Sequence, residues 1–221
     1  TGVLLLSRKK KDQTRGIIFH RIVGGCEVKP HSRPYMAALK VDGSFGCGRF
    51  LIAPQWVLSA GHCNGDISVI LGAHNLNAVE ETQQVFGVIS YHKHPGYSLV
   101  AVHGRPSEKN PPCSVAGWGW IDATYFRTPK LFETNVAALS RRKCLRFDPE
   151  LTDGMMCAGS RATLCDVSSV SDIIFGGDSG SALLCNGVAH GIVSYSFQIP
   201  PSIYTRVAFY LPWIEATMNE Y

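Results

Sequence analysis

Residues 181–196 read SALLCNGVAHGIVSYS, two short apolar runs on either side of Asn186-Gly187. Asn-Gly favours the two-residue type I′ turn that joins antiparallel strands, so this stretch predicts a β-hairpin. Residues 34–52, PYMAALKVDGSFGCGRFLI, have the same arrangement around Asp42-Gly43. Similar runs, rich in Val, Ile and Tyr and separated by Gly, Pro and Asn, recur along the chain. This pattern is typical of an all-β barrel or sandwich.

The last segment of the chain predicts a helix. Leu211, Ile214 and Met218 recur at helical spacing, and Pro212 can occupy the first turn, where a missing N–H costs nothing. We expect the apolar stripe of this helix to pack on the barrel. Hydrophobic residues make up 45% and charged residues 17% of the 221 positions, so the composition predicts one globular unit without a long disordered region.

The charges of the chain point to no special partner. The net charge is +4, and the dense basic run Arg8–Lys11 lies near the N-terminus, where it gives little support for nucleic-acid binding. A second basic cluster consists of Arg141, Arg142, Lys143 and Arg146. We interpret it as an exposed loop in preference to a site for an acidic glycan. No apolar run reaches the length of a membrane span, so none is expected.

Eight cysteines predict disulfides, and therefore a secreted protein or one stored in a secretory granule, because cytosolic thiols stay reduced. None forms a C-x-x-C pair, and the spacing of Cys47 and Cys63 fits no common zinc site, so we expect no metal and no cofactor. Residues 1–21, TGVLLLSRKKKDQTRGIIFHR, are interpreted as the remnant of a leader or propeptide outside the fold. Residues 22–221 then form the domain.

Residues 175–184, FGGDSGSALL, contain a candidate nucleophile. Ser179 follows an aspartate and stands among glycines, so a tight turn could expose its hydroxyl. The amides of Gly177 and Ser179 would then converge on one point as an oxyanion hole. A glycine-rich hairpin turn without chemistry is the alternative.

Residues 58–63, LSAGHC, contain a candidate general base. His62 follows an apolar run and precedes a cysteine, so it would lie at a strand end where a disulfide can fix its backbone. The other histidines are interpreted as structural, because a lone histidine usually is. They are His20, His31, His74, His92, His94, His103 and His190.

Residues 21–25, RIVGG, predict activation by proteolysis. A cut after Arg21 would create a new ammonium group on Ile22. A buried ammonium needs an anion, and Asp178, next to the candidate nucleophile, is well placed to supply one. The pair would set the backbone of residues 177–179.

Seven short motifs occur together in one order: IVGG, LSAGHC, CSVAGWG, MMCAG, GDSG, GIVSY and YTRV. In this the sequence resembles the chymotrypsin-like serine peptidases over almost all of residues 22–221. The run KPHSRPYMA, residues 29–37, is similar to the granule-stored branch, the granzymes and mast-cell proteases. Phe175 stands where many relatives have a cysteine, and the usual partner of that cysteine is also missing, as in granzymes.

The resemblance implies two antiparallel six-stranded Greek-key β-barrels with a C-terminal helix and a site in the cleft between the barrels. Ser179 would attack the scissile carbonyl while His62 takes its proton, and the amides of Gly177 and Ser179 would stabilise the oxyanion. Ile22 would pair with Asp178. Residues 194–196, namely Ser194, Tyr195 and Ser196, would align the substrate as an added strand.

The resemblance also implies the disulfides and the specificity pocket. The implied pairs are Cys47–Cys63, Cys113–Cys185 and Cys144–Cys157, while Cys26 and Cys165 either form a fourth bridge or stay free. Ile173 aligns with the pocket floor, and Ser202 stands where the wall normally has glycine. We therefore expect an apolar or constricted pocket.

One stretch departs from the family pattern. Residues 92–113, HKHPGYSLVAVHGRPSEKNPPC, contain no aspartate, although the family has a strand here whose aspartate orients the histidine. His62 and Ser179 are 117 positions apart, against about 140 in the family template. We expect the first barrel to lack this strand. Asp66 and Glu108 are poor substitutes, because Asp66 lies in a segment leading away from the cleft and Glu108 lies in the shortened connection.

The sequence thus predicts a serine endopeptidase that works through an acyl-enzyme and is impaired by the missing aspartate. The expected loss is about 10⁴-fold in turnover. The alternative is an inactive homologue that keeps the cleft as a binding module. Polypeptide substrates and serine-protease inhibitors are the expected partners, and a monomer is the expected state.

Overall fold

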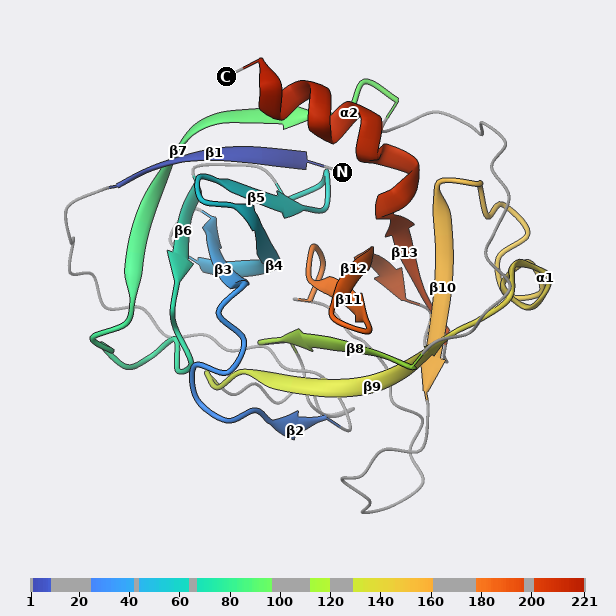
Figure 1. Cartoon of the computed structure of the whole chain (residues 1–221). Coiled ribbons are helices and arrows are strands. Elements are labelled where there is room, and N and C mark those ends of the chain that lie inside the picture. The colour runs from blue at the N-terminus through green and yellow to red at the C-terminus, as the bar shows by residue number, and fades with distance from the viewer. Residues whose placement is uncertain are drawn as a thin grey trace.

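The structure, a computed structural model, describes residues 2–8, 25–41, 44–63, 67–96, 112–119, 129–160, 178–196 and 201–220. It is an all-β molecule with two sheets and a C-terminal helix, which confirms the predicted class (Figure 1). Among the described residues, neither helix combines the length and apolarity needed to cross a bilayer.

The first sheet is a closed barrel in the order β1-β5-β4-β3-β6-β7. Its strands are β1 (Gly2–Arg8), β3 (Met36–Val41), β4 (Ser44–Ala53), β5 (Trp56–Ser59), β6 (Ile67–Leu71) and β7 (Gln84–Lys93). Every neighbouring pair is antiparallel. The sequence predicted the β3–β4 hairpin correctly, since Val41 pairs with Ser44, although Asp42 and Gly43 lie outside the described residues.

The second sheet has the order β10-β13-β12-β11-β8-β9-β2, and β10 also pairs with β9, which curls the sheet back on itself. Its strands are β2 (Cys26–Glu27), β8 (Pro112–Gly117), β9 (Phe132–Ala138), β10 (Met155–Ser160), β11 (Ala182–Cys185), β12 (Val188–Ser196) and β13 (Ser202–Arg206). The β11–β12 hairpin has the predicted turn, because Asn186 and Gly187 both adopt positive φ, 52° and 78°. Positive φ at both central residues is what a type I′ turn requires.

The strand expected to be missing from the first barrel is replaced by β1. Residues 2–8 pair with β5 on one side and with β7 on the other, so the first barrel is closed, contrary to the expectation that it would lack a strand, and β1 comes from the segment that was interpreted as a leader (Figure 1). The physical reason is that β5 and β7 would otherwise each leave a row of unpaired backbone groups, and an extended segment satisfies both rows. Local sequence does not reveal such a long-range pairing.

The C-terminal helix α2 (Val207–Asn219) starts earlier than predicted. Pro212 therefore lies inside the helix instead of in its first turn, and Leu211 is exposed rather than buried. The buried face consists of Val207, Ile214 and Thr217. A second, four-residue helix, α1 (Arg141–Cys144), precedes β10.

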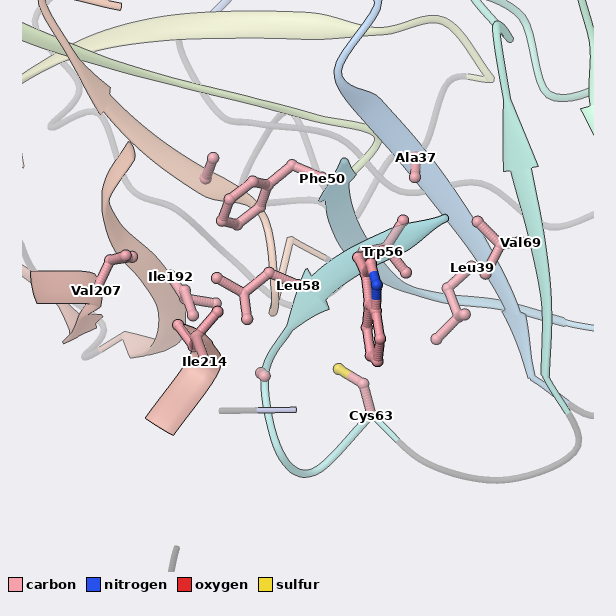
Figure 2. Packing of buried hydrophobic residues seen from close by; sticks show 13 residues of the cluster. Ala37, Leu39, Phe50, Trp56, Leu58, Cys63, Val69, Ile192, Val207 and Ile214 are labelled. Atoms are coloured by element: carbon pink, nitrogen blue, oxygen red, sulfur yellow. The ribbon is translucent and has the colours of Figure 1, made fainter. Parts of the chain in front are cut away.

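The main core joins the two sheets. Leu58 of β5, Ile192 of β12 and Ile214 of α2 lie close together in it (Figure 2). Burying such side chains contributes about 1.5–3 kcal/mol each, so this cluster fixes the first barrel against the second sheet and the helix. The three implied disulfides, Cys47–Cys63, Cys113–Cys185 and Cys144–Cys157, are all present.

Candidate active site

His62 lies in the short turn that follows β5. The disulfide between Cys47 and Cys63 stands beside it, with both sulfur atoms and a ring nitrogen of His62 within 4.8 Å of one another. This group is no metal site as it stands, because both sulfurs are oxidised and thiolate is the form that binds metals. From the barrel side, Arg49 Nη2 donates to the carbonyl of Cys63 at 2.7 Å. The turn that carries His62 is therefore held at its backbone.

Ser179 lies in a turn between Asp178 and Ser181 that leads into β11. The amide of Ser181 donates to the carbonyl of Asp178 at 2.9 Å, and the amide of Gly180 donates to the carbonyl of Val193 at 2.8 Å. Gly180 has φ +92°, and a Cβ there would stand 2.2 Å from the carbonyl oxygen of Gly48. Only glycine fits this position, so the residue after the candidate nucleophile is determined by close packing between the two sheets.

Backbone contacts bring the two candidate residues into one place. The amide of Gly48 donates to the carbonyl of Ser179 at 2.8 Å, and Gly48 directly follows the cysteine bonded to Cys63. The sulfur of Cys63 lies 3.7 Å from the same carbonyl, a van der Waals contact because a disulfide sulfur has no proton to donate. Ser179 is half-buried and His62 is exposed. Within the described residues, their side chains form no hydrogen bond.

The electrostatic surroundings of His62 are unusual for a general base. It has no ion pair among the described residues. Partial desolvation of the ring, followed by nearby positive charge that includes Lys93, lowers the pKa of His62. The neutral imidazole is therefore favoured, which a base requires, but the imidazolium that forms during proton transfer is disfavoured.

Asp178 is fully buried beneath the turn of Ser179. Its Oδ1 accepts the amide of Gly119 at 2.8 Å, while Oδ2 has no partner. Burial raises the pKa of Asp178 to about 8, and the hydrogen bond from Gly119 offsets only part of this. A Cβ on Gly119 would stand 2.0 Å from Oδ2, so the carboxyl occupies a close-fitting space that admits only glycine there.

Comparison with known proteins agrees with this geometry. The sequence model of the family described as Trypsin matches residues 22–105 and 99–214. Mast cell protease 3 of Ovis aries is 40% identical over 235 residues, covering 91% of this chain and 90% of the relative. Cathepsin G of Homo sapiens is 37% identical, covering 90% and 88%, and granzyme F of Mus musculus is 36% identical, covering 90% and 91%. This chain belongs to the trypsin family.

Two residues that the resemblance places in the specificity pocket, Ser196 and Ser202, meet across β12 and β13. Ser196 pairs with Ser202 in the strand register, and the hydroxyl of Ser196 donates to that of Ser202 at 2.9 Å. Ser202 is buried. Its hydroxyl is engaged by Ser196, and the constriction of the pocket stays a prediction.

Tyr195 lies next to this pair and is held by a residue that the sequence did not indicate. Its hydroxyl donates to Oδ2 of Asp148 at 2.5 Å. Asp148 is buried and belongs to the segment after α1, and its Oδ1 accepts the amide of Glu150 at 3.0 Å. Nothing in the local sequence pairs positions 148 and 195, so only the fold reveals this contact.

Arg49 is the other residue that was missed. A signal was available, because a cation inside the apolar run CGRFLI is unusual for a strand that the pattern places in a core. By contrast, several predicted positions lie outside the described residues. They are Arg21, Ile22, Asp66, Glu108, Cys165, Ile173 and Gly177. Cys26 is disulfide-bonded.

The basic cluster around α1 is only partly free. Arg141 donates to the carbonyls of Leu151 and Thr152 and lies 3.2 Å from Oδ1 of Asp153. Arg142, Lys143 and Arg146 are exposed. An acidic glycan would meet three exposed cations here, and its binding stays the less favoured alternative to an ordinary exposed surface.

Proposed function

We propose that this chain is a serine endopeptidase that is made as a zymogen, is cut after Arg21, and turns substrate over slowly because His62 has no carboxylate partner among the residues that the structure describes. Family membership supports the reaction class. Ser179 as nucleophile and His62 as base are supported by their positions on either side of the Cys47–Cys63 disulfide. The amides of Gly177 and Ser179 would stabilise the tetrahedral oxyanion.

The slow turnover rests on one observation, the absence of any acid partner for His62 among the described residues. A carboxylate normally fixes the tautomer of the imidazole and stabilises its positive form. The nearby side-chain charge that acts on His62 is that of Lys93, which is positive and therefore destabilises the imidazolium. The expected loss is about 10⁴-fold, equivalent to about 5.5 kcal/mol of barrier.

The alignments support a missing segment at the expected place. The family match falls into two pieces that meet at residues 99–105, inside the stretch that lacks the aspartate. The alignment with mast cell protease 3 extends over 235 positions, more than the 221 residues of this chain. The relative therefore has residues without a counterpart here.

Activation by the cut is supported by Asp178. A fully buried carboxyl with one unpartnered oxygen is costly as an anion, and the raised pKa expresses that cost. The ammonium of Ile22 would supply the missing partner. The resulting ion pair would fix the turn that carries Ser179, so cleavage would convert a strained site into an ordered one.

Substrate class and location follow from the same proposal. A polypeptide would lie along Ser194–Ser196 as an added strand. The Ser196–Ser202 contact favours small or apolar side chains in the pocket. The disulfides support passage through the secretory route, with secretion or granule storage as the end point. Serine-protease inhibitors would compete at this cleft, and we expect a monomer.

The test is the labelling rate of the cut chain with an organophosphonate probe. We expect labelling at Ser179, about 10⁴-fold slower than in a trypsin-family protease with a complete triad. Ser179→Ala is the control and should abolish it. His62→Ala should cost no more than about a further 10²-fold, since an unoriented base has little left to contribute.

The opposite outcomes are equally clear. Labelling at the rate of a complete protease would refute the claim of slow chemistry. A cut, folded chain with no labelling at all would instead support the second candidate, a binding module that retains the cleft. The retained pair of Ser179 and His62 favours the enzyme over that alternative.

A further inference from the structure

The position of β1 in the first barrel has a consequence for the activated protein. β1 lies between β5 and β7 as an interior strand with partners on both sides (Figure 1). Gly2–Leu5 pair with Ser59–Trp56, and Gly2–Arg8 pair with Lys93–Phe86. Arg21 lies between β1 and the rest of the domain in the sequence. A cut after Arg21 would therefore separate β1 covalently from the barrel it closes.

We infer that β1 stays bound after this cut, so that the activated protein consists of two chains held together without a covalent link. The inference rests on the proposed activation at Arg21. It gives the segment 1–21 a structural role that continues after cleavage, in addition to keeping the zymogen inactive.

The backbone pairing supports retention. Release of β1 would expose the unpaired edges of both β5 and β7, whereas release of a strand from the edge of a sheet exposes only one. The net contribution of one hydrogen bond to stability is modest, but release of β1 requires all the bonds along its seven residues to break together. Strands supplied by a separate peptide bind in this way in other β-sheets.

The same pairing connects β1 to the candidate base. Gly2 pairs with Ser59, the last residue of β5, and His62 follows three residues later. On the other edge Gly2 pairs with Lys93, whose charge acts on His62. Loss of β1 would therefore free both segments that border His62. Retention of the strand and reactivity of Ser179 are nevertheless separate measurements.

The experiment uses the full chain with residues 17–21 replaced by a recognition sequence that a site-specific protease cuts directly before Ile22. The intact mass establishes the cut. Native mass spectrometry and size-exclusion chromatography then measure whether the N-terminal peptide remains with residues 22–221. We expect one peptide for each domain, with release only when denaturant unfolds the domain.

A proline variant sharpens the result. Leu4 pairs with both Val57 and Tyr91, so Leu4→Pro removes an N–H from the middle of the strand and should lead to loss of the peptide after the cut. Asp12→Pro, beyond the end of β1, is the matched control and should leave the peptide bound. Because the main measurement is made on the cut chain with its natural β1, it stands even if Leu4→Pro fails to fold.

Two outcomes would overturn the inference. One is quantitative loss of the peptide from a cut domain that keeps the thermal midpoint of the uncut chain. The other is retention that Leu4→Pro leaves unchanged in a folded, cut domain. Labelling of Ser179 is recorded in parallel, so an unreactive domain that holds its peptide would refute the proposed function and leave this inference standing.

Discussion

At the scale of single residues, Arg49 and Asp178 are buried ionisable groups without full partners. Arg49 is fully buried, and its Nε and Nη1 have no hydrogen bond. Burial lowers the pKa of Arg49 to about 9, because the charged form is the one that loses its hydration. Within the described residues the fold thus holds two costly groups close to the turns that carry His62 and Ser179.

Replacing Arg49 by methionine should stabilise the uncut chain. Methionine has a similar length and no unsatisfied N–H, so we expect a gain of about 1–2 kcal/mol in the free energy of unfolding, after allowing for the lost bond to Cys63. Denaturant unfolding measures it. Lys40→Met, a half-buried cation on the neighbouring β3, is the control and should change stability by less than about 0.5 kcal/mol. If Arg49→Met instead lowered the free energy of unfolding by more than about 1 kcal/mol, the prediction would be contradicted.

Asp178 should make the uncut chain less stable as the pH rises. Its folded-state pKa of about 8 lies above the ordinary value of 3.8, so between these values the folded state binds more protons than the unfolded state. The free energy of unfolding then falls by up to about 1.4 kcal/mol for each pH unit in this window. Thermal unfolding at pH 5 and pH 7.5, compared with Asp178→Asn, isolates this slope. Equal slopes in the two proteins would refute it.

At the scale of elements, α2 contains an avoidable defect. Pro212 lies inside this helix and is exposed, and it offers no N–H to the carbonyl four residues before it. Pro212→Ala should raise the free energy of unfolding by about 1–3 kcal/mol. Glu215→Ala, exposed on the same helix, is the control and should have an effect within about 0.5 kcal/mol. If Pro212→Ala did not raise the free energy of unfolding, the helix would have to be bent at this position so that it accommodates the proline ring.

Which elements could be predicted depended on whether their signal was local. The Asn186-Gly187 hairpin was predicted because the turn residues themselves dictate positive φ. The start of α2 was not, since Val207 and Ala208 continue directly from β13 without a side-chain cap. The positions of Ser179 and His62 followed from motifs, whereas the contacts of Arg49 and Asp148 depend on residues far away in the sequence.

At the scale of the whole molecule, closure of the first barrel depends on seven residues that the sequence placed outside the fold. The family pattern predicted that a strand would be missing, but it did not indicate that β1 closes the barrel. Which segment pairs with β5 and β7 depends on every extended segment of the chain that could reach them, and no local pattern reveals it. The second sheet gave less difficulty, because β8, β10, β11, β12 and β13 each contain or adjoin a motif or a disulfide cysteine, whereas β9 has neither.

Deleting residues 2–8 should therefore make the protein associate. β5 and β7 would each present an unpaired edge, and exposed edges pair with other chains. Size-exclusion chromatography with light scattering should show dimers or larger species in place of a monomer. Deleting residues 9–15 removes the same number of residues and leaves β1 in the sequence, so it serves as the control. A monomeric, stable product of the first deletion would show that the barrel closes without β1.

The Cys47–Cys63 bridge gives the molecule a dependence on its redox surroundings. One half of the bridge is followed by Gly48, which binds the carbonyl of Ser179, and the other half follows His62. Reduction would break this short path between the candidate nucleophile and the candidate base. In a reducing compartment such as the cytosol, the chain would therefore lose the covalent restraint beside both candidate residues, and we expect any hydrolytic activity to be confined to oxidising compartments.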